Sequence, residues 1–545
     1  MLPVVMRRQR FWFWLFASAA GLIQCWSYRF WIEPDGINYL DVANAYQHHD
    51  WSAAINSYWS PLYSWLLAVT FYVVRPLGYW ESTVLHLLNF VIFLCALRCG
   101  EFFISELVNS RTHKSIPDWA IWTVGYSLLL FVSLFMNAAY LDTPDLCTSG
   151  LVYVAAALLT RIRSGGATLR VFMIFGAVLG IAYFSKTIMF LVAFAFLAAA
   201  GRRRGTVLAF ACFVAVTLPW ITILSRSVGR ITYGDAGPAN YVGYVAYSGT
   251  PVHPPRIIFT SPEVREFATP IRATYPPWYN APYWIEGLHP RFEWKVQFRV
   301  LVRNAKDYLH ILTGQKEFIA GFLLLFLAWP KLLPIRWHVL VPALWGFSLY
   351  ALVHVESRLV GVFFVLFWMI LYSGLRIRSE RFLKLVIGAI ALATAFKIVR
   401  ATVARPLDSP HVQWQTAQAI QKMGIEPGSQ VAVFGHTTDT DYWAHLLGVR
   451  VVADIQADAM PTYWSLPPGV RTEILSRLCD LDIRAVVTTN PQEDGWQMIP
   501  GTSFSVRFPG NSASDSKEFL NSQRSNSKEC APSHASGDER LHDAH

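Results

Sequence analysis

Long apolar segments dominate this chain of 545 residues. A helix needs about 20 mostly apolar residues to cross a bilayer, and about eleven segments come close to that length. With 54% hydrophobic residues and a mean hydropathy of +0.33, the chain has more apolar surface than a soluble globule can bury. The sequence therefore predicts an α-helical polytopic membrane protein with about 11 transmembrane helices. The predicted spans lie near residues 10–28, 81–99, 118–137, 143–160, 168–183, 186–201, 205–225, 313–330, 336–353, 357–375 and 382–399.

The apolar segment Pro61–Val74 is too short for a full crossing. As a helix of about 14 residues it would reach only roughly 21 Å of a 30 Å hydrocarbon core. If it does not cross, every short turn on one side of the membrane is basic, as cytoplasmic turns are, and the loops 29–80 and 226–312 face outside. The net charge of +10 is then a topology signal, and nucleic acid is not an expected partner. The basic turns contain Arg98, Arg111 and Lys114; Arg161, Arg163 and Arg170; Arg202, Arg203 and Arg204; Lys331 and Arg336; and Arg376, Arg378, Arg381 and Lys384.

Several charged motifs fall on the predicted outer side, each at the end of a span. A carboxylate costs about 3 kcal/mol at the centre of a bilayer, so charged residues at a span end are either solvated or functional. Because these motifs lie on the same predicted side of the membrane, we expect their side chains to meet in one site. The motifs are PDG with Asp35, LDTPDL with Asp142 and Asp145, SKT with Lys186, and HVESR with His354, Glu356 and Arg358.

Asp35 is the candidate catalytic base. A partly desolvated carboxylate in such a turn is suited to accept a proton from a hydroxyl or to hold a divalent cation. Asp142 and Asp145 are the second acidic candidates, although Asp is also a favoured capping residue at helix starts. Asp41 and Tyr39, which follow Asp35 on a predicted helix, are candidate substrate-binding residues, and Asp41 also fits an exposed helix position.

Lys186 and Arg358 are single cations near the outer ends of spans. One interpretation of each residue is a cation without a specific role, whose side chain extends to the lipid headgroups. Each also fits a phosphate clamp, because a fixed positive charge stabilises a departing anion. With His354 and Glu356 they form the predicted substrate-binding set.

The C-terminal part of the chain has a different composition. Residues 402–510 alternate short strand and helix patterns, which predicts a small soluble α/β domain after the transmembrane domain of residues 1–400. The lone Gly435 after the first strand is no dinucleotide fingerprint. Residues 511–545 are rich in Ser, Asn, Lys and Asp and predict a disordered tail.

The order of these motifs resembles the polytopic glycosyltransferases of the GT-C class, including the bacterial aminoarabinose transferases and the protein O-mannosyltransferases. The resemblance covers roughly residues 10–400. It rests on PDGINYLDVA, followed by DW and YWSPLY, in the first outer loop, on TPDL at the mouth of a later span, on SKT, and on VESR before another span.

The resemblance implies transfer of a sugar from a polyprenyl-phosphate-linked donor to a lipid, glycan or protein acceptor, with inversion, at the extracytoplasmic face of the cytoplasmic (inner) membrane. In this scheme Asp35 activates the acceptor hydroxyl, Asp145 or Asp142 is the second acidic residue, and Lys186 and Arg358 hold the departing lipid phosphate. The C-terminal domain is then extracytoplasmic as well.

Two departures from the family pattern affect the details. The aminoarabinose transferases carry a Lys-Pro pair where this chain has Ser60-Pro61. The acidic turn is PDG instead of a DE pair, so adjacent metal ligands do not carry over, and dependence on Mg²⁺ or Mn²⁺ is left open.

Two other classes of function fit parts of the pattern. A transporter of a lipid-linked or anionic solute would also have about a dozen spans, but its charges would lie near the midplane instead of at span ends. A noncatalytic assembly protein would use the acidic residues only as helix caps.

Overall fold

The computed structural model describes residues 4–111, 115–201, 204–267, 273–332, 336–407, 410–436, 441–489 and 491–509. The chain divides into two compact units. The helical unit comprises Met1–His253 and Asn280–Pro410, and the α/β unit comprises Pro254–Tyr279 and His411–His545. The predicted disordered tail, 511–545, lies outside the described residues.

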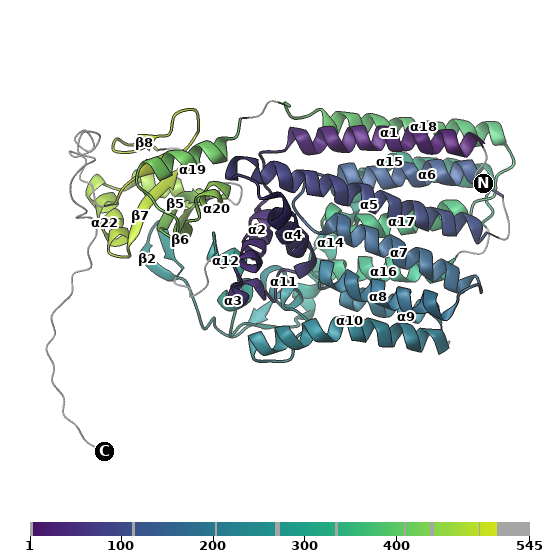
Figure 1. The fold of residues 1–545 in the computed structure, drawn as a ribbon, viewed down its shortest axis with the longest axis horizontal. Coiled ribbons are helices and arrows are strands. Elements are labelled where there is room, and N and C mark those ends of the chain that lie inside the picture. Colours follow the sequence, from purple (N-terminus) through teal and green to yellow (C-terminus); the bar gives the residue numbers. More distant parts are fainter. Residues whose placement is uncertain are drawn as a thin grey trace, which may run out of the picture. The chain divides into compact units, whose positions relative to one another are not determined.

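Long apolar helices run side by side through the helical unit (Figure 1). Each predicted apolar run coincides with one of them, which confirms the predicted helical fold. They are α1 (Val4–Ser27), α5 (Glu81–Asn109), α6 (Asp118–Phe131) with its π-helical continuation η2 (Val132–Met136), α7 (Asp145–Arg163), α8 (Leu169–Ser185), α9 (Met189–Ala200), α10 (Arg204–Val228), α15 (Lys316–Ala328), α16 (Trp337–Ala351), α17 (Ser357–Ser373) and α18 (Glu380–Thr402).

Within the described residues, five helical segments are long and apolar enough by themselves to cross a membrane. A sixth crossing results if the bent pair of α14 (Trp294–Thr313) and α15 forms one span. The protein is therefore a multi-pass membrane protein. The larger number of about eleven spans stays a prediction, because helices such as α9 are shorter than a bilayer core.

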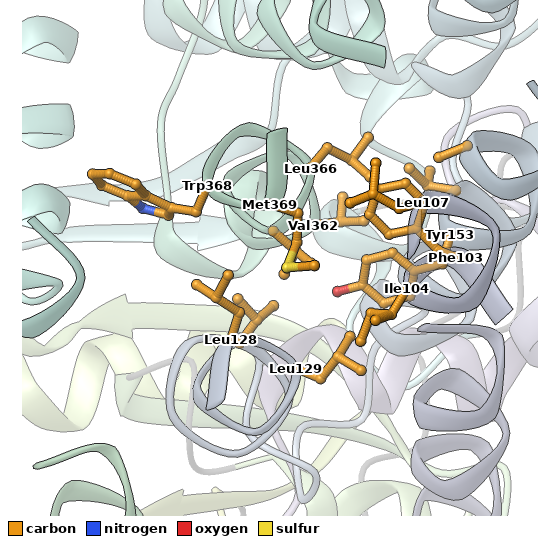
Figure 2. Close-up of a cluster of buried hydrophobic side chains, with 14 of the residues drawn as sticks. Phe103, Ile104, Leu107, Leu128, Leu129, Tyr153, Val362, Leu366, Trp368 and Met369 are labelled. Atoms are coloured by element: carbon orange, nitrogen blue, oxygen red, sulfur yellow. The ribbon is translucent and has the colours of Figure 1, made fainter. Parts of the chain in front are cut away.

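Tight helix contacts hold the bundle together. Figure 2 shows the centre of the core, where apolar side chains of α5, α6, α7 and α17 meet. Glycines let these helices approach closely: a Cβ at Gly100 would come within 2.4 Å of Leu129, and one at Gly125 within 2.5 Å of Ile104. Larger residues at either position would push the helices apart. The labelled core residues are Phe103, Ile104, Leu107, Leu128, Leu129, Tyr153, Val362, Leu366, Trp368 and Met369.

Short helices from the two long loops gather at one end of the bundle (Figure 1). The segment Pro61–Val74 forms a 14-residue helix, α4, which packs on α2 and α8. The other short elements of this unit are α2 (Pro34–Gln47), α3 (Trp51–Ala54), η1 (Gly78–Trp80), α11 (Ala236–Tyr244), α13 (Ala281–Trp284) and the antiparallel strands β1 (Tyr247–Ser248) and β4 (His289–Pro290).

The α/β unit is built on a seven-stranded sheet of order β2-β3-β6-β5-β7-β9-β8. Its centre is parallel, with β5 (Gln430–His436) between β6 (Arg450–Gln456) and β7 (Ile483–Thr488), as expected for the predicted α/β pattern. The outer pairs are antiparallel and comprise β2 (Arg256–Thr260), β3 (Glu263–Glu266), β8 (Gln497–Met498) and β9 (Ser505–Arg507). The helices are α12 (Pro276–Tyr279), α19 (Val412–Lys422), α20 (Tyr442–Leu447), η3 (Ala457–Ala459), α21 (Met460–Ser465) and α22 (Pro468–Cys479).

A buried polar cluster joins the loop-derived strands to this sheet. Asp454 of β6 is fully buried and accepts two hydrogen bonds from Arg265 of β3, at 3.0 and 2.9 Å. It also accepts from the Tyr275 hydroxyl at 3.0 Å and from Gln456 at 2.7 Å, and His436 lies 3.6 Å away. The buried carboxylate is thus fully surrounded by donors, as a buried charge requires.

Candidate active site

The candidate site begins where the loop after α1 turns into α2. Pro34 occupies the first position of this helix and Asp35 lies in its first turn. A proline there lacks only an N–H that would have no partner in the helix, and a carboxylate in the first turn interacts favourably with the helix dipole. The Asp35 carboxylate is 18% exposed, so it is accessible from outside the fold.

Arg358 links this helix start to the beginning of α17. Its guanidinium donates to Asp35 Oδ2 at 2.8 Å and to Glu356 Oε2 at 2.8 Å, and it lies 3.4 Å from Glu33 Oε1. One arginine therefore contacts carboxylates from two parts of the sequence more than 300 residues apart, since Arg358 and Asp35 are separated by 323 positions. The planar fork of donors in arginine makes such shared contacts possible.

His354 completes the turn before α17. Its Nε2 is 2.9 Å from Glu356 Oε1, and its ring stacks on Tyr244 of α11 with centroids 4.3 Å apart. The hydrogen bond with His354 and the charge of Arg358 lower the pKa of Glu356 to about 2, although burial opposes the shift. Glu356 therefore stays ionised and holds Arg358 in place.

Asp145 and Lys186 form a second ion pair. Asp145 is the first residue of α7, and Lys186 follows α8 directly. The Lys186 ammonium lies 2.5 Å from Asp145 Oδ1, and the Thr143 hydroxyl donates to Oδ2 at 2.8 Å. The Lys186 side chain is 17% exposed, whereas that of Asp145 is 4% exposed, so the cation is the more accessible partner.

Asp142 has a different environment from Asp145. It is fully buried, and its two oxygens accept from the Glu33 backbone N–H at 3.1 Å and from Asn89 Nδ2 at 2.9 Å. His86 Nδ1 lies 3.4 Å away. Burial raises the pKa of Asp142, and the donor from the Glu33 backbone opposes the shift. The contacts of Asp142 thus fix the start of α2 against α5.

Glu33 is a residue of the cluster that the sequence analysis missed. Burial and then the negative charge of Asp35 raise its pKa to about 8, while Arg358 lowers it and Asp145 and Glu356 raise it. Charged residues from three of the sequence motifs therefore lie close enough to influence the ionisation of Glu33. The available signal was the pair of acidic residues in Glu33-Pro34-Asp35.

Tyr39 and Asp41 lie further along α2. The Tyr39 ring is buried and packs edge-on against Trp59 and Tyr63, with centroids 5.0 and 5.3 Å apart. Burial, and then the charge of Asp35, raises the pKa of Tyr39. Asp41 is half-buried. Tyr39 is therefore a packing residue next to Asp35.

Residues of segments 29–80 and 226–312 contact each other near this site. The Tyr58 hydroxyl donates to Asn240 of α11 at 2.9 Å, so the first loop and the long loop are joined. The Ser60 hydroxyl lies 3.2 Å from that of Thr187, the residue that follows Lys186 in the sequence.

The donor set does not fit a resident divalent cation. Among the described residues, no group of three or more His, Cys, Asp and Glu side chains is arranged to hold a metal ion. A cation at Asp35 would also lie beside the guanidinium of Arg358, which would repel it.

No family model and no curated protein sequence matches the chain. Several solved structures match it over most of its length. ArnT from Cupriavidus metallidurans in the apo state aligns with a TM-score of 0.51 and 13% identity, covering 92% of this chain and 98% of that one. An oligosaccharyltransferase from Archaeoglobus fulgidus, tethered to an acceptor peptide with the NVT sequon, aligns with a TM-score of 0.51 and 11% identity, over 88% and 69%.

The chain has the GT-C fold. Both matching proteins are glycosyltransferases of this class, so the resemblance predicted from the motifs is confirmed at the level of fold. A further structure of the same ArnT, bound to undecaprenyl phosphate, aligns with a TM-score of 0.48 and 12% identity, over 92% and 98%. At these identities the GT-C fold alone is established, and the chemistry of the site rests on the residues described above.

Proposed function

We propose that this protein is a membrane glycosyltransferase that moves a sugar from a polyprenyl-phosphate-linked donor to an acceptor hydroxyl at the extracytoplasmic face of the inner membrane. The observation that carries the proposal is the cluster in which Arg358 contacts Asp35, Glu33 and Glu356 at the end of a GT-C bundle. Basic turns at the opposite span ends support the outer location of the cluster.

Asp35 is the base in this proposal. Arg358 donates to its Oδ2, and no described residue donates to Oδ1, so one carboxylate oxygen is available to an acceptor hydroxyl. A carboxylate in hydrogen-bond reach of the attacking hydroxyl is suited to take its proton. Glu356 and His354 position Arg358, and through it they position the base.

Arg358 and Lys186 are the proposed phosphate contacts. Arginine has five N–H donors and lysine has three, so each can keep its carboxylate partner and still donate to a phosphate oxygen. As the bond to the sugar breaks, negative charge grows on the phosphate, and fixed cations stabilise that charge more than they stabilise the ground state. Asp145 holds Lys186 in position at 2.5 Å.

The proposed reaction is a single displacement. The acceptor oxygen forms a bond to the anomeric carbon while the bond from that carbon to the phosphate oxygen breaks. The bonding pair leaves with the polyprenyl phosphate, the hydroxyl proton moves to Asp35, and the configuration at the anomeric carbon inverts. Asp142 acts indirectly by holding the Glu33 backbone. The donor is a hexose or a pentose, and the acceptor is a lipid, a glycan or a protein.

The test is sugar transfer by the full-length protein in proteoliposomes, with a panel of radiolabelled polyprenyl-phosphate hexoses and pentoses. The variants are Asp35→Asn and Asp145→Asn. Glu380→Gln makes a matched change at a carboxylate that is 60% exposed and distant in sequence from every site motif. We expect one donor to be consumed by the wild type and by Glu380→Gln, and both site variants to lose transfer.

The proposal is wrong if no donor in the panel is consumed by folded protein. It also fails if Asp35→Asn and Asp145→Asn transfer the sugar as fast as Glu380→Gln does. The identity of the donor consumed would decide between a hexosyl- and a pentosyltransferase.

A further inference from the structure

Helix α14 carries its apolar side chains on the outside. Trp294, Phe298, Val302 and Leu309 are 66%, 55%, 42% and 63% exposed. Their spacing follows helical turns, and at 100° per residue they span a stripe only about 80° wide. A soluble surface helix shows the opposite pattern, with its apolar stripe turned to the core.

A basic strip borders this apolar stripe on one side. The exposed residues Lys295, Arg299, Arg303, Lys306 and His310 fall between about 100° and 180° on the same helical projection. Four of them are permanently charged at neutral pH. The exposed surface of α14 therefore has an apolar half and a cationic half.

Polar side chains of α14 fix the helix to the end of α16. Gln297 donates to the Leu352 carbonyl at 2.9 Å, Asn304 to the Ala351 carbonyl at 2.8 Å and Arg303 to the Val353 carbonyl at 3.2 Å. The last carbonyls of a helix have no partner within it, and α14 supplies those partners.

The residues that carry these carbonyls directly precede the candidate site in the sequence. Val353 precedes His354, and Tyr241 of α11 also bonds to Gln297, at 2.9 Å. Figure 1 shows α14 at the end of the bundle where α2 and α11 lie. The position of α14 is thus coupled to the turn that holds Arg358.

A sharp bend separates α14 from the apolar helix α15. The angle between the two helices is 77°. If α15 runs across the bilayer, α14 must run nearly parallel to the membrane plane. In that orientation one exposed half of α14 faces the acyl chains while the other lies at the level of the headgroups.

We propose that α14 is an interfacial helix that binds the anionic phospholipid surface of the membrane. Trp294, Phe298, Val302 and Leu309 enter the boundary of the acyl chains, and the basic strip binds headgroup phosphates. Charge complementarity selects this occupant, because a second copy of the same helix would bring two cationic strips together. This inference rests on the geometry of α14 and not on the proposed glycosyl transfer.

The test measures the membrane depth of α14 in the full-length protein. Phe298→p-azidophenylalanine is conjugated to an environment-sensitive dye, and the protein is placed in nanodiscs of phosphatidylcholine with or without phosphatidylglycerol. Two quenchers are compared, iodide in water and a doxyl group on the lipid chain. The matched control is the same label at Met498, an apolar side chain of the α/β unit that is 71% exposed.

We expect iodide to quench the label at Phe298 at least about threefold less than the label at Met498, and the lipid-borne doxyl to quench only the former. Phosphatidylglycerol should increase the doxyl quenching. The triple variant Lys295→Gln, Arg299→Gln, Lys306→Gln should lose that increase. Arg256→Gln, Lys422→Gln, Arg477→Gln, an equal loss of charge in the α/β unit, should keep it.

Three results would overturn the proposal. Equal iodide quenching at the two labelled positions would show that α14 is in water. Shielding from both quenchers would show that protein covers the helix. A response to inorganic phosphate alone, equal to that to phosphatidylglycerol, would show a site for a free anion instead of a lipid surface.

Discussion

Arg358 in the helical unit and Arg265 in the α/β unit hold carboxylates with nearly the same geometry but in different surroundings. The shortest contacts are 2.8 Å from Arg358 to Asp35 and 2.9 Å from Arg265 to Asp454. Asp454 is 0% exposed and accepts from three side chains, whereas the Asp35 carboxylate is 18% exposed and accepts from Arg358.

The difference separates a structural ion pair from a candidate reactive one. A carboxylate that is fully surrounded by donors has no free lone pair for another molecule, and removing it leaves a buried charge without a partner. A carboxylate with an open side can accept a proton from a ligand. The Arg358 cluster also has an excess of carboxylates, so the loss of one leaves the cation paired.

The largest expected effect is on activity, at Asp35. Asp35→Asn should lower the transfer rate by about 10² to 10⁴ fold, the range for loss of a general base. It should change the free energy of unfolding by less than about 1 kcal/mol, because Arg358 keeps Glu33 and Glu356. Transfer assays and thermal unfolding in detergent measure the two effects. A large loss of stability with unchanged transfer would show that the pair of Asp35 and Arg358 is structural, as the pair of Asp454 and Arg265 is.

The next effect is on stability, at Asp454. Asp454→Asn should destabilise the α/β unit by about 3 to 5 kcal/mol, because Arg265 then lacks its buried partner. Pulse proteolysis of the full-length protein in urea measures this change. Glu473→Gln, at an exposed pair with Arg477, serves as the control and should shift stability by less than about 0.5 kcal/mol. Equal shifts in both variants would contradict a structural role for Asp454.

A smaller effect is expected at Gly36, which lets α2 begin close to Asp142. A Cβ at Gly36 would come within 2.6 Å of Asp142 Cβ, so Gly36→Ala must move the helix that carries Asp35. Such overpacking costs about 1 to 3 kcal/mol and should slow transfer. Gly237→Ala in α11, where a Cβ meets nothing within 4 Å, is the matched control and should be neutral. Equal transfer by the two variants would show that the position of α2 is not critical.

The smallest effect, when expressed per pH unit, is a pH dependence of stability at Glu33. The folded protein holds the Glu33 proton up to about pH 8, whereas an ordinary glutamate releases it near 4.5. The folded state therefore binds more protons between these values, and stability should fall as the pH rises through this window. The slope is at most about 1.4 kcal/mol per pH unit.

Glu33→Gln should remove this slope, so its stability relative to the wild type should rise between pH 5 and pH 8. Thermal unfolding across that range measures the change. Glu286→Gln, at a carboxylate that is 61% exposed, should leave the slope as it is. An unchanged slope in Glu33→Gln would mean that Glu33 ionises in the folded protein as it does in water.

The sequence predicted the helices well, because a membrane span requires a long apolar segment. In the bilayer such a segment satisfies its backbone hydrogen bonds by forming a helix, so tertiary contacts rarely change its structure. It also predicted that Asp35, Asp145, Lys186 and Arg358 belong together, because span ends on one side of a membrane are confined to a thin layer. Which carboxylate pairs with which cation depends on helix packing, and no local pattern encodes it.

Other features were not predictable from local patterns. The contact between Asn89 and Asp142 joins α5 to the start of α7 over 53 positions. The long loop 226–312 gave no sign that β2 and β3 would join a sheet formed by the C-terminal residues, since short edge strands carry little alternation. The exposed apolar stripe of α14 was not predicted, because basic residues alternate with the apolar ones and the segment is therefore not a continuous apolar run.

The insertion of β2 and β3 into the distant sheet sets an order for biosynthesis. Arg265 and Asp454 are 189 positions apart, so the ribosome completes β3 long before its partner β6 exists. During that interval Val264, which is fully buried in the finished sheet, has β2 beside it but not β6. A nascent chain that stops before residue 450 therefore leaves an unpaired hairpin edge exposed, and quality-control proteases would recognise that edge in truncated products.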